Sequence, residues 1–472
     1  MLISDLLEVI NATYKGKDLE IGLITDDSRK CVQNSIFVCH ENGTEYVGQA
    51  VKNGAVAVVS QKDICDGCII VEDSRKAYAL LCAAFFKNCH RKLKLIGVTG
   101  TNGKTTVATM IHTILSLSGK KCGMLTTVCN EYNNERHSGE LTTPDCFSMH
   151  RMFYEMVQQG TEYCIVEASS QGLSQQRLYG LSFEIGVFTN ISQDHLDYHK
   201  TVENYCSAKA ELFKNSGCSV INSDDSKADV FISSSMGKTI TYSLKSDSAH
   251  YTAKCIKLTE DGSDYAIVAE GLIHRIKLNI PGEFNVSNSM AAIITSIECG
   301  CSLESCAAAL RSFSGVKGRM EVLDINRDFK VIIDYAHTPD SMRKVLLSMK
   351  NFPKGRIIVL FGCGGDRDKD KRSQMGKTAS ELADISIITS DNPRHEEPMK
   401  IIDDILSGIK NKKNKVFIKE NRTKAIEYAL KIAEKNDIIL LLGKGHENYT
   451  VIGDEKIPYD EREIVFSLLN KS

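Results

Sequence analysis

The segment GVTGTNGKTT at residues 97–106 constrains the fold of this chain more than any other. An apolar run at residues 93–98 leads into it, which predicts a strand. Apolar residues at helical spacing follow it: Val107, Met110, Ile111, Ile114 and Leu115. Strand, glycine-rich turn and helix in this order form the setting that a phosphate-binding loop requires. The segment therefore predicts an α/β domain that binds nucleotide phosphates at the start of a helix.

The residue types of this loop match that chemistry. Gly100 and Gly103 let the backbone turn and approach an anion, while Lys104 supplies a charge and Thr105 a hydroxyl for Mg²⁺. Val98 stands where the strict phosphate-loop pattern has glycine. The alternative is a glycine-rich turn whose lysine points to solvent. Lysine and threonine directly after Gly103 favour nucleotide binding.

Length and composition describe a soluble, multidomain protein. A chain of 472 residues predicts two to four domains. The formal charge of −2 gives no general attraction to nucleic acid or to anionic membranes. The opening MLISDLLEVI lacks a basic run, and no apolar run is long enough to span a bilayer. The odd count of 17 cysteines favours reduced thiols. We expect a cytoplasmic protein that spans no membrane and binds no nucleic acid.

Patterning along the chain predicts three α/β domains. Residues 1–88 form a small α/β unit, and residues 89–316 alternate strands with helices in a mostly parallel sheet that contains the phosphate loop. Period-two patterning at residues 251–281 predicts an antiparallel insertion. Residues 317–472 form a Rossmann-like domain. In it, four strands run into the polar turns DYAHTP, GCGG, SDNPR and GKGHE. Because ligands bind at the carboxyl ends of parallel strands, we expect these turns to line one site.

Three further polar residues are candidates for chemistry beside the phosphate loop. Glu167 closes the apolar strand YCIVE, where a carboxylate can bind Mg²⁺, although a buried ion pair is the alternative. His195 follows another strand in NISQDHLDYH, and Lys209 follows in SAKAELF. A surface lysine is the alternative for Lys209.

Seven motifs together resemble the Mur ligase family: GTNGKTT, EASSQGL, TNISQDHLDYHKTVENYCSAKAELF, DYAHTP, GCGGDRDKDKR, DNPRHEEP and GKGHENY. The similarity runs from about residue 27 to residue 463. It implies an ATP-dependent ligase that joins an amino acid to a carboxylate of a peptidoglycan precursor. The acid is first phosphorylated to an acyl phosphate, which an amine then attacks. It also implies that the three domains bind a UDP-linked substrate, ATP and the amino acid in that order, and we expect a monomer.

The resemblance also implies a cofactor site. ATP and two Mg²⁺ ions are expected, with Lys209 carbamylated so that its charge is reversed. The phosphates would contact Gly100, Thr101, Asn102, Gly103, Lys104, Thr105 and Thr106. One Mg²⁺ would contact Thr105 and Glu167, and the second His195 and Lys209. Nucleotide contacts are also expected from Asn285, Arg319, Asp334 and His337, although a hinge or loop role fits each of these four equally well.

The substrate residues implied by the resemblance fall into two groups. UDP-N-acetylmuramoyl-L-alanyl-D-glutamate would contact Ser28, Thr142, Thr143, Ser169, Gln175 and Arg177. The incoming amino acid would contact Arg367, Asp391, Asn392, Pro393, Arg394, Gly443 and Glu447. The guanidinium of Arg394 predicts meso-diaminopimelate rather than L-lysine, because it matches the extra carboxylate. Charged hydrogen bonds are worth roughly 1.5–3 kcal/mol each, so lysine would be rejected.

Two departures from the family leave alternatives open. The loop at residues 40–43 is shorter than usual, and Gln171 stands where histidine is usual. One alternative is a paralogous Mur-type ligase with another acceptor or amino acid. A second is an enzyme like folylpolyglutamate synthase, against which the DNPR and DDSRK segments argue. A third is a nucleotide-binding protein without ligase activity, which would be expected to have lost Lys104, Glu167, His195 or Lys209.

Overall fold

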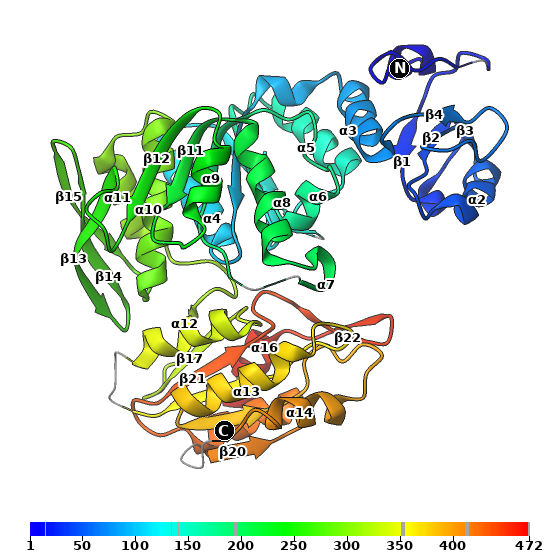
Figure 1. The fold of residues 1–472 in the computed structure, drawn as a ribbon. Coiled ribbons are helices and arrows are strands. Elements are labelled where there is room, and N and C mark those ends of the chain that lie inside the picture. The colour runs from blue at the N-terminus through cyan, green and yellow to red at the C-terminus, as the bar shows by residue number, and fades with distance from the viewer. Residues whose placement is uncertain are drawn as a thin grey trace.

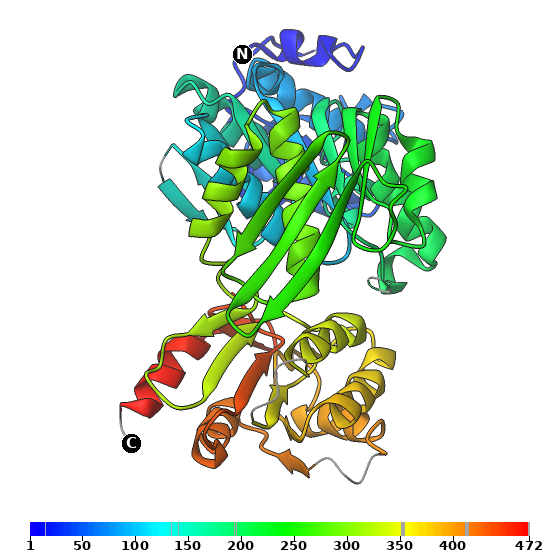
Figure 2. The same cartoon turned by 90° about the vertical axis from the view of Figure 1, so that its left-hand side faces the viewer.

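The computed structural model describes residues 1–14, 16–133, 135–139, 141–192, 194, 196–350, 355–410 and 415–470. Along the described residues, three larger sheets and a two-stranded hairpin follow one another, and each larger sheet has its own helices (Figure 1). Figures 1 and 2 show the elements of residues 317–472 on one side of the central sheet, with the N-terminal elements on another side. The α/β fold with parallel-rich sheets that the sequence predicts is confirmed. The domain limits 88 and 316 stay predictions.

The N-terminal sheet is parallel, in the order β1-β2-β3-β4. Its strands are β1 Leu23–Thr25, β2 Ser35–Val38, β3 Ala55–Ser60 and β4 Ile69–Ile70. Its helices are α1 Ile3–Glu8, η1 Ser28–Lys30, η2 Thr44–Tyr46, α2 Val47–Lys52 and α3 Ser74–Phe85. The Asp73 side chain caps α3 by accepting from the amides of Arg75 and Lys76, as an N-terminal aspartate commonly does. Helix η3 Cys89–Lys92 leads into the next sheet.

The central sheet has the order β15-β14-β13-β12-β11-β10-β5-β9-β6-β7-β8. Its strands are β5 Lys94–Thr99, β6 Cys122–Leu125, β7 Cys129–Tyr132, β8 Glu135–Ser138, β9 Tyr163–Glu167, β10 Phe183–Phe188, β11 Ser216–Asn222, β12 Lys238–Ser243, β13 Tyr251–Thr259, β14 Gly262–Ala269 and β15 Leu272–Leu278. The middle strands are parallel, and β13, β14 and β15 are joined antiparallel. This confirms the predicted antiparallel insertion. A second antiparallel extension, β6-β7-β8, was not predicted.

Helices cover both faces of the central sheet. They are α4 Lys104–Leu117, α5 Cys146–Gln158, α6 Ser170–Ser174, α7 Leu196–His199, α8 Val202–Lys214, α9 Ala228–Ser234, α10 Glu283–Glu298 and α11 Leu303–Ser312. Residues of α4, α10 and α11 share one apolar core with Ile96 and Val98 of β5. Residues of α5, α8 and α9 share the other core with Leu95. Because β5 alternates between the two cores, it is fixed in the middle of the domain, and the loop that follows it is fixed as well.

The C-terminal sheet has the order β16-β17-β21-β18-β19-β20 and is parallel except for β16. Its strands are β16 Glu321–Leu323, β17 Lys330–Asp334, β18 Ile357–Phe361, β19 Ile385–Ile388, β20 Lys415–Ile418 and β21 Ile438–Leu442, and the hairpin β22 Tyr449–Ile452 and β23 Glu455–Pro458 follows. Helices α12 Pro339–Lys350, α13 Asp370–Leu382 and α14 Pro398–Leu406 cover one face. Helices α15 Arg422–Ile432 and α16 Glu461–Leu469 cover the other. The carboxyl ends of β17, β18, β19 and β21 therefore open at one edge.

Two further features concern the thiols and the helix lengths. All 17 cysteines are free. In the described ranges, no helix combines the length and apolar character needed to cross a bilayer.

Candidate functional site

The loop after β5 is held in the shape that a phosphate cradle requires. Gly100 and Gly103 have φ values of 142° and 87°, in the range that favours glycine. A Cβ at Gly103 would collide with Oδ1 of Asn288, so the loop tolerates no side chain there. The Thr101 amide donates to the Asn190 carbonyl oxygen at 2.8 Å. The Asn102 amide donates to Asn190 Oδ1 at 3.1 Å, and Thr105 and Thr106 stand in the first turn of α4. The segment after β10 and helix α10 thus flank the loop.

Two lysine ammonium groups converge on this loop. Lys104 Nζ donates to the carbonyl oxygens of Gly100 and Thr101 at 3.0 and 2.9 Å. Lys209, on α8, is 1% exposed, and its Nζ donates to the same Gly100 oxygen at 2.9 Å. Burial lowers the pKa of Lys104, although Glu167 opposes the shift. Burial lowers the pKa of Lys209 much further, and the charge of Lys104 adds to the effect. The surface role that was the alternative for Lys209 is excluded.

Glu167 ends β9, beside the phosphate loop. Its carboxylate is fully buried, and its two oxygens accept from the Thr127 amide and hydroxyl, each at 3.1 Å. Strand β9 pairs with β5 so that Glu167 lies opposite Val98, two residues before Gly100. Two threonine contacts leave lone pairs on this carboxylate for a cation. The carboxylate hydrogen bonds of Glu167 are therefore to Thr127, and the nearby positive charge that acts with it is that of Lys104.

The described residues fit Mg²⁺ only together with a phosphate ligand. In the parts of the chain that the structure describes, no group of three or more His, Cys, Asp or Glu side chains is placed to hold a metal ion. Thr105 and Glu167 offer oxygen atoms beside the phosphate loop, which suits Mg²⁺ because it is commonly held by one or two carboxylates plus phosphate oxygens. His195, the predicted ligand of the second ion, lies outside the described residues.

The predicted dipeptide residues form one hydrogen-bonded cluster next to Glu167. The Thr143 hydroxyl donates to the Glu167 carbonyl oxygen at 2.6 Å and lies 2.9 Å from the Ser169 hydroxyl. Arg177 donates to the Thr143 carbonyl oxygen and to Gln175 Oε1, both at 2.7 Å. The Thr142 hydroxyl lies 3.0 Å from the Thr127 hydroxyl. The structure therefore brings these five predicted residues together at the carboxyl end of β9.

A cavity of about 460 Å³ lies between this cluster and the N-terminal elements. Gln175 and Arg177 line it from the central domain, and Lys30 and Arg75 from the N-terminal domain. Ser28 is not among the lining residues. It is buried and donates to Gln49 Oε1 at 2.9 Å, while Asp26 and Asp27 beside it face the cavity. His40, in the shortened loop, also lines the cavity.

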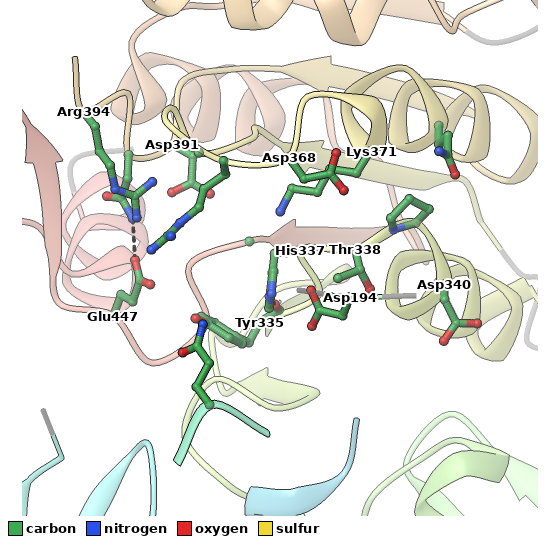
Figure 3. Close-up of a pocket in the computed structure, with 17 residues that line it drawn as sticks. Asp194, Tyr335, His337, Thr338, Asp340, Asp368, Lys371, Asp391, Arg394 and Glu447 are labelled. Atoms are coloured by element: carbon green, nitrogen blue, oxygen red, sulfur yellow. Dashed lines mark hydrogen bonds between the residues drawn. The ribbon is translucent and has the colours of Figure 1, made fainter. Parts of the chain in front are cut away.

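The four predicted turns of the C-terminal domain line a second cavity, of about 320 Å³ (Figure 3). It also receives Gln171 and Asp194 from the central domain. In Figure 3, Arg394 and Glu447 lie at one end and Asp340 at the other, with His337 and Asp194 between them. Asp340 accepts from Asn102 Nδ2 of the phosphate loop at 3.4 Å. The prediction that the turns meet in one site is confirmed, and this site adjoins the phosphate loop.

Charged groups of both signs surround the Arg394 end of this cavity. Arg367, Arg394, Asp391, Asn392, Gly443 and Glu447 all line it. Asn392 donates to Glu447 at 2.9 Å, and Arg394 Nη1 donates to the Gly365 carbonyl oxygen at 2.7 Å. Burial, and next the Asp391 charge, raise the pKa of Glu447. Burial alone would raise the pKa of Asp391, but Lys444 and Arg422 lower it overall. Pro393 is buried between Asn392 and Arg394 and does not line the cavity.

The four weaker nucleotide candidates have mixed surroundings. Arg319 donates to the Thr105 hydroxyl at 3.4 Å, which places it at the phosphate loop. His337 lines the second cavity, and burial, with Lys371 adding to it, lowers its pKa to about 4. Asp334 accepts from the amides of Met320 and Ala336 at 2.7 and 2.8 Å, so it holds its own turn. Asn285 donates to the Pro281 carbonyl oxygen at 2.8 Å inside the domain. Asp334 thus lies in its own turn and Asn285 in the first turn of α10, and the nucleotide contacts of all four residues stay predictions.

Sequence reasoning missed several residues of the site. Tyr335, Asp368 and Lys371 line the second cavity, and Lys444 Nζ lies 3.4 Å from Asp391 and donates to Asn392 at 3.0 Å. All four stand within or next to the quoted turn motifs, so position in a turn was the available signal. Tyr335 also lies 4.5 Å beneath the guanidinium of Arg319.

Comparison with known proteins gives a consistent result. Residues 98–296 match the Mur ligase middle domain, and residues 318–445 match the Mur ligase, glutamate ligase domain. The chain is 43% identical over 464 residues, 96% of each protein, to UDP-N-acetylmuramoyl-L-alanyl-D-glutamate--2,6-diaminopimelate ligase 1 of Clostridium acetobutylicum. It is 43% identical over the whole length of the ligase of that name from Caldanaerobacter subterraneus subsp. tengcongensis. A solved structure of a ligase with this name covers 100% of the chain and 99% of its own, with 31% identity and a TM-score of 0.72. The chain belongs to the Mur ligase family.

Proposed function

We propose that the protein uses ATP to add meso-diaminopimelate to UDP-N-acetylmuramoyl-L-alanyl-D-glutamate, releasing ADP and phosphate. The observation that carries the proposal is the second cavity, where Arg367 and Arg394 face the same space as Asp391 and Glu447. Two guanidinium groups and two carboxyl groups match an amino acid that has both a carboxylate and an ammonium at its far end. The names of the full-length relatives support the same substrates.

In the proposed reaction, the first cavity binds the acceptor, the phosphate loop binds ATP, and the second cavity binds the incoming amino acid. The hydrogen-bonded cluster that contains Arg177 holds the acceptor so that the acceptor's carboxylate reaches the phosphate loop. There Lys104 and the α4 amides bind the phosphates of ATP. The carboxylate oxygen attacks the terminal phosphorus, and ADP leaves. The incoming amino acid, as its neutral amine, then attacks the acyl carbon from the side of the second cavity; the C–O bond to phosphate breaks, and phosphate and one proton leave. Bound Mg²⁺ would neutralise charge on the phosphates, with Thr105 and Glu167 as the residues that fit it.

The surroundings of Lys209 support the proposal that it is carbamylated. A lysine reacts with carbon dioxide only as the neutral amine, losing one proton as the N–C bond forms. Burial and the charge of Lys104 both favour that neutral form. The resulting carbamate would place a negative group where the phosphate loop already holds Lys104. Lys209 would then be suited to a cation rather than repelling one.

Amide formation with different amino acids tests the proposed function. Purified protein is incubated with ATP, Mg²⁺ and the UDP-muramoyl dipeptide, and with meso-diaminopimelate, L-lysine or L-ornithine. Released phosphate is measured, and the product mass is determined. We expect amide formation with meso-diaminopimelate and rates about 100-fold or more lower with the other two, because a site built for charged partners rejects analogues that lack them. Preference for lysine or ornithine would contradict the substrate assignment and indicate a paralogous ligase.

A further inference from the structure

The residue that connects the two arginine-bearing loops of the second cavity lies outside the cavity itself. Arg372, in the first turn of α13, has a fully buried side chain. Its Nη2 donates to Glu396 Oε1 at 2.8 Å, and its Nη1 donates to Glu396 Oε2 at 3.0 Å. This is the paired, parallel geometry that makes an arginine–carboxylate contact directional as well as strong. A buried arginine is retained only when it is paired, so Glu396 and Arg372 depend on each other.

The same pair contacts both loops. Arg372 Nη2 also donates to the Gly364 carbonyl oxygen at 3.3 Å, and Glu396 accepts from the Asp366 amide at 2.6 Å. Glu396 itself belongs to the loop that carries Arg394. Arg372 Nη1 reaches further, to Asp404 on α14, at 2.9 Å. The pair thus joins the 362–369 loop to the 391–397 loop and ties both to α13 and α14.

The two loops need such a restraint. Asp366 and Arg394 have φ values of 52° and 49°, which residues with a side chain rarely adopt. Such conformations persist when surrounding contacts determine them. The Gly365 amide donates to the Asn392 carbonyl oxygen at 2.9 Å, and Arg394 Nη1 donates back to the Gly365 carbonyl oxygen at 2.7 Å. The direction of the Arg394 guanidinium therefore depends on where the first loop lies.

We propose that Arg372, through Glu396, is a positioning residue that fixes Arg367 and Arg394 for recognition of the incoming amino acid. The inference rests on the proposed amino-acid site. It assigns part of the selectivity to a residue that touches no substrate, because Arg372 is absent from the lining of the cavity. A guanidinium that can move by about an ångström loses most of the benefit of a paired contact with a carboxylate.

The test compares Arg372→Met with Arg356→Met. Arg356 is partly exposed and also contacts a carboxylate through two nitrogens, since its Nη2 and Nε lie 2.7 and 3.1 Å from Asp437 Oδ2. That pair lies at the starts of β18 and β21, at the opposite end of the same sheet. Steady-state KM values are measured for the amino acid, ATP and the UDP-muramoyl dipeptide, together with the kcat/KM ratio of meso-diaminopimelate to L-lysine. Glu396→Gln, at a partly exposed position, is a second variant that keeps the side-chain shape.

For Arg372→Met we expect an increase of about tenfold or more in KM for the amino acid, with KM for ATP changed less than about twofold. The diaminopimelate-to-lysine ratio should fall, Glu396→Gln should change both quantities in the same direction, and Arg356→Met should change neither. Unchanged amino-acid KM and ratio in Arg372→Met and Glu396→Gln would overturn the inference. Equal changes in all three KM values, or the same changes in Arg356→Met, would also overturn it. If the wild type forms no amide with diaminopimelate, the proposed function fails instead, and the KM of whichever amino acid it uses still tests Arg372.

Discussion

Burial decides the chemistry of individual side chains in this site, and Lys209 is the clearest case. Its side-chain nitrogen has the Gly100 carbonyl oxygen and the ring of Tyr205 as neighbours, at 2.9 Å and 4.7 Å. The same helix carries Lys214, which is exposed and pairs with Glu211. Lys209 is buried and Lys214 is exposed to water, and this difference in burial distinguishes a candidate catalytic residue from a surface residue on the same helix.

At this scale we predict that Lys209→Ala lowers turnover by about 100-fold or more. The variant loses the negative charge of the proposed carbamate near the transferring phosphoryl group. Lys214→Ala should keep wild-type turnover. Short carboxylic acids should partly restore Lys209→Ala, since they can occupy the space of a carbamate. Phosphate release and circular dichroism are measured for both variants. Full activity of folded Lys209→Ala would refute the proposed role.

From the sequence, residues of the candidate site could be predicted more reliably than the contacts that these residues make in the folded protein. Arg394 and Glu447 were expected from the resemblance to Mur ligases, and the structure places both at one cavity. For Asp334 a nucleotide contact and a hinge or loop role were expected equally, and in the structure both its oxygens accept backbone amides. The role of Arg372 could not be predicted, because its contact with Glu396 spans 24 residues and depends on how two loops fold against each other.

At the scale of elements, the strand–loop–helix unit of β5 and α4 could be predicted almost completely. Its strand begins and ends one residue later than expected, at Lys94 and Thr99. The carboxyl ends of four parallel strands also meet as predicted, because parallel pairing puts them at one edge. The short strands β7 and β8 were missed, since β8 is exposed along its whole length and has no apolar pattern to reveal it.

The phosphate loop allows a prediction with a matched control. Gly103→Ala should lower stability by about 1–2 kcal/mol from its left-handed backbone, and more because its Cβ would collide with Asn288. Gly119 also has a positive φ, 79°, but a Cβ there meets nothing within 4 Å. Gly119→Ala should therefore show only the backbone cost and should keep ATP binding, whereas Gly103→Ala should lose it. Thermal unfolding with and without ATP and Mg²⁺ measures both effects. Equal behaviour of the two variants would contradict the cradle geometry.

At the scale of the whole molecule, two cavities flank one phosphate loop. The first lies between the N-terminal and central domains, and the second between the central and C-terminal domains. Contacts between the loop and the C-terminal domain include Asn102 with Asp340 and Arg319 with Thr105, both at 3.4 Å. In the proposed reaction, the acid, the phosphoryl group and the amine would each bind at a separate site, and the three domains bring these sites together.

Transfer of labelled oxygen tests most directly the central claim that the acid is activated by phosphorylation. The acceptor is prepared with ¹⁸O in both oxygens of its reacting carboxylate, and the reaction is run with ATP, Mg²⁺ and meso-diaminopimelate. If an acyl phosphate forms, each released phosphate carries one ¹⁸O and each amide keeps one. Mass spectrometry of the phosphate and of the product gives the distribution. Amide formation with unlabelled phosphate would contradict the account.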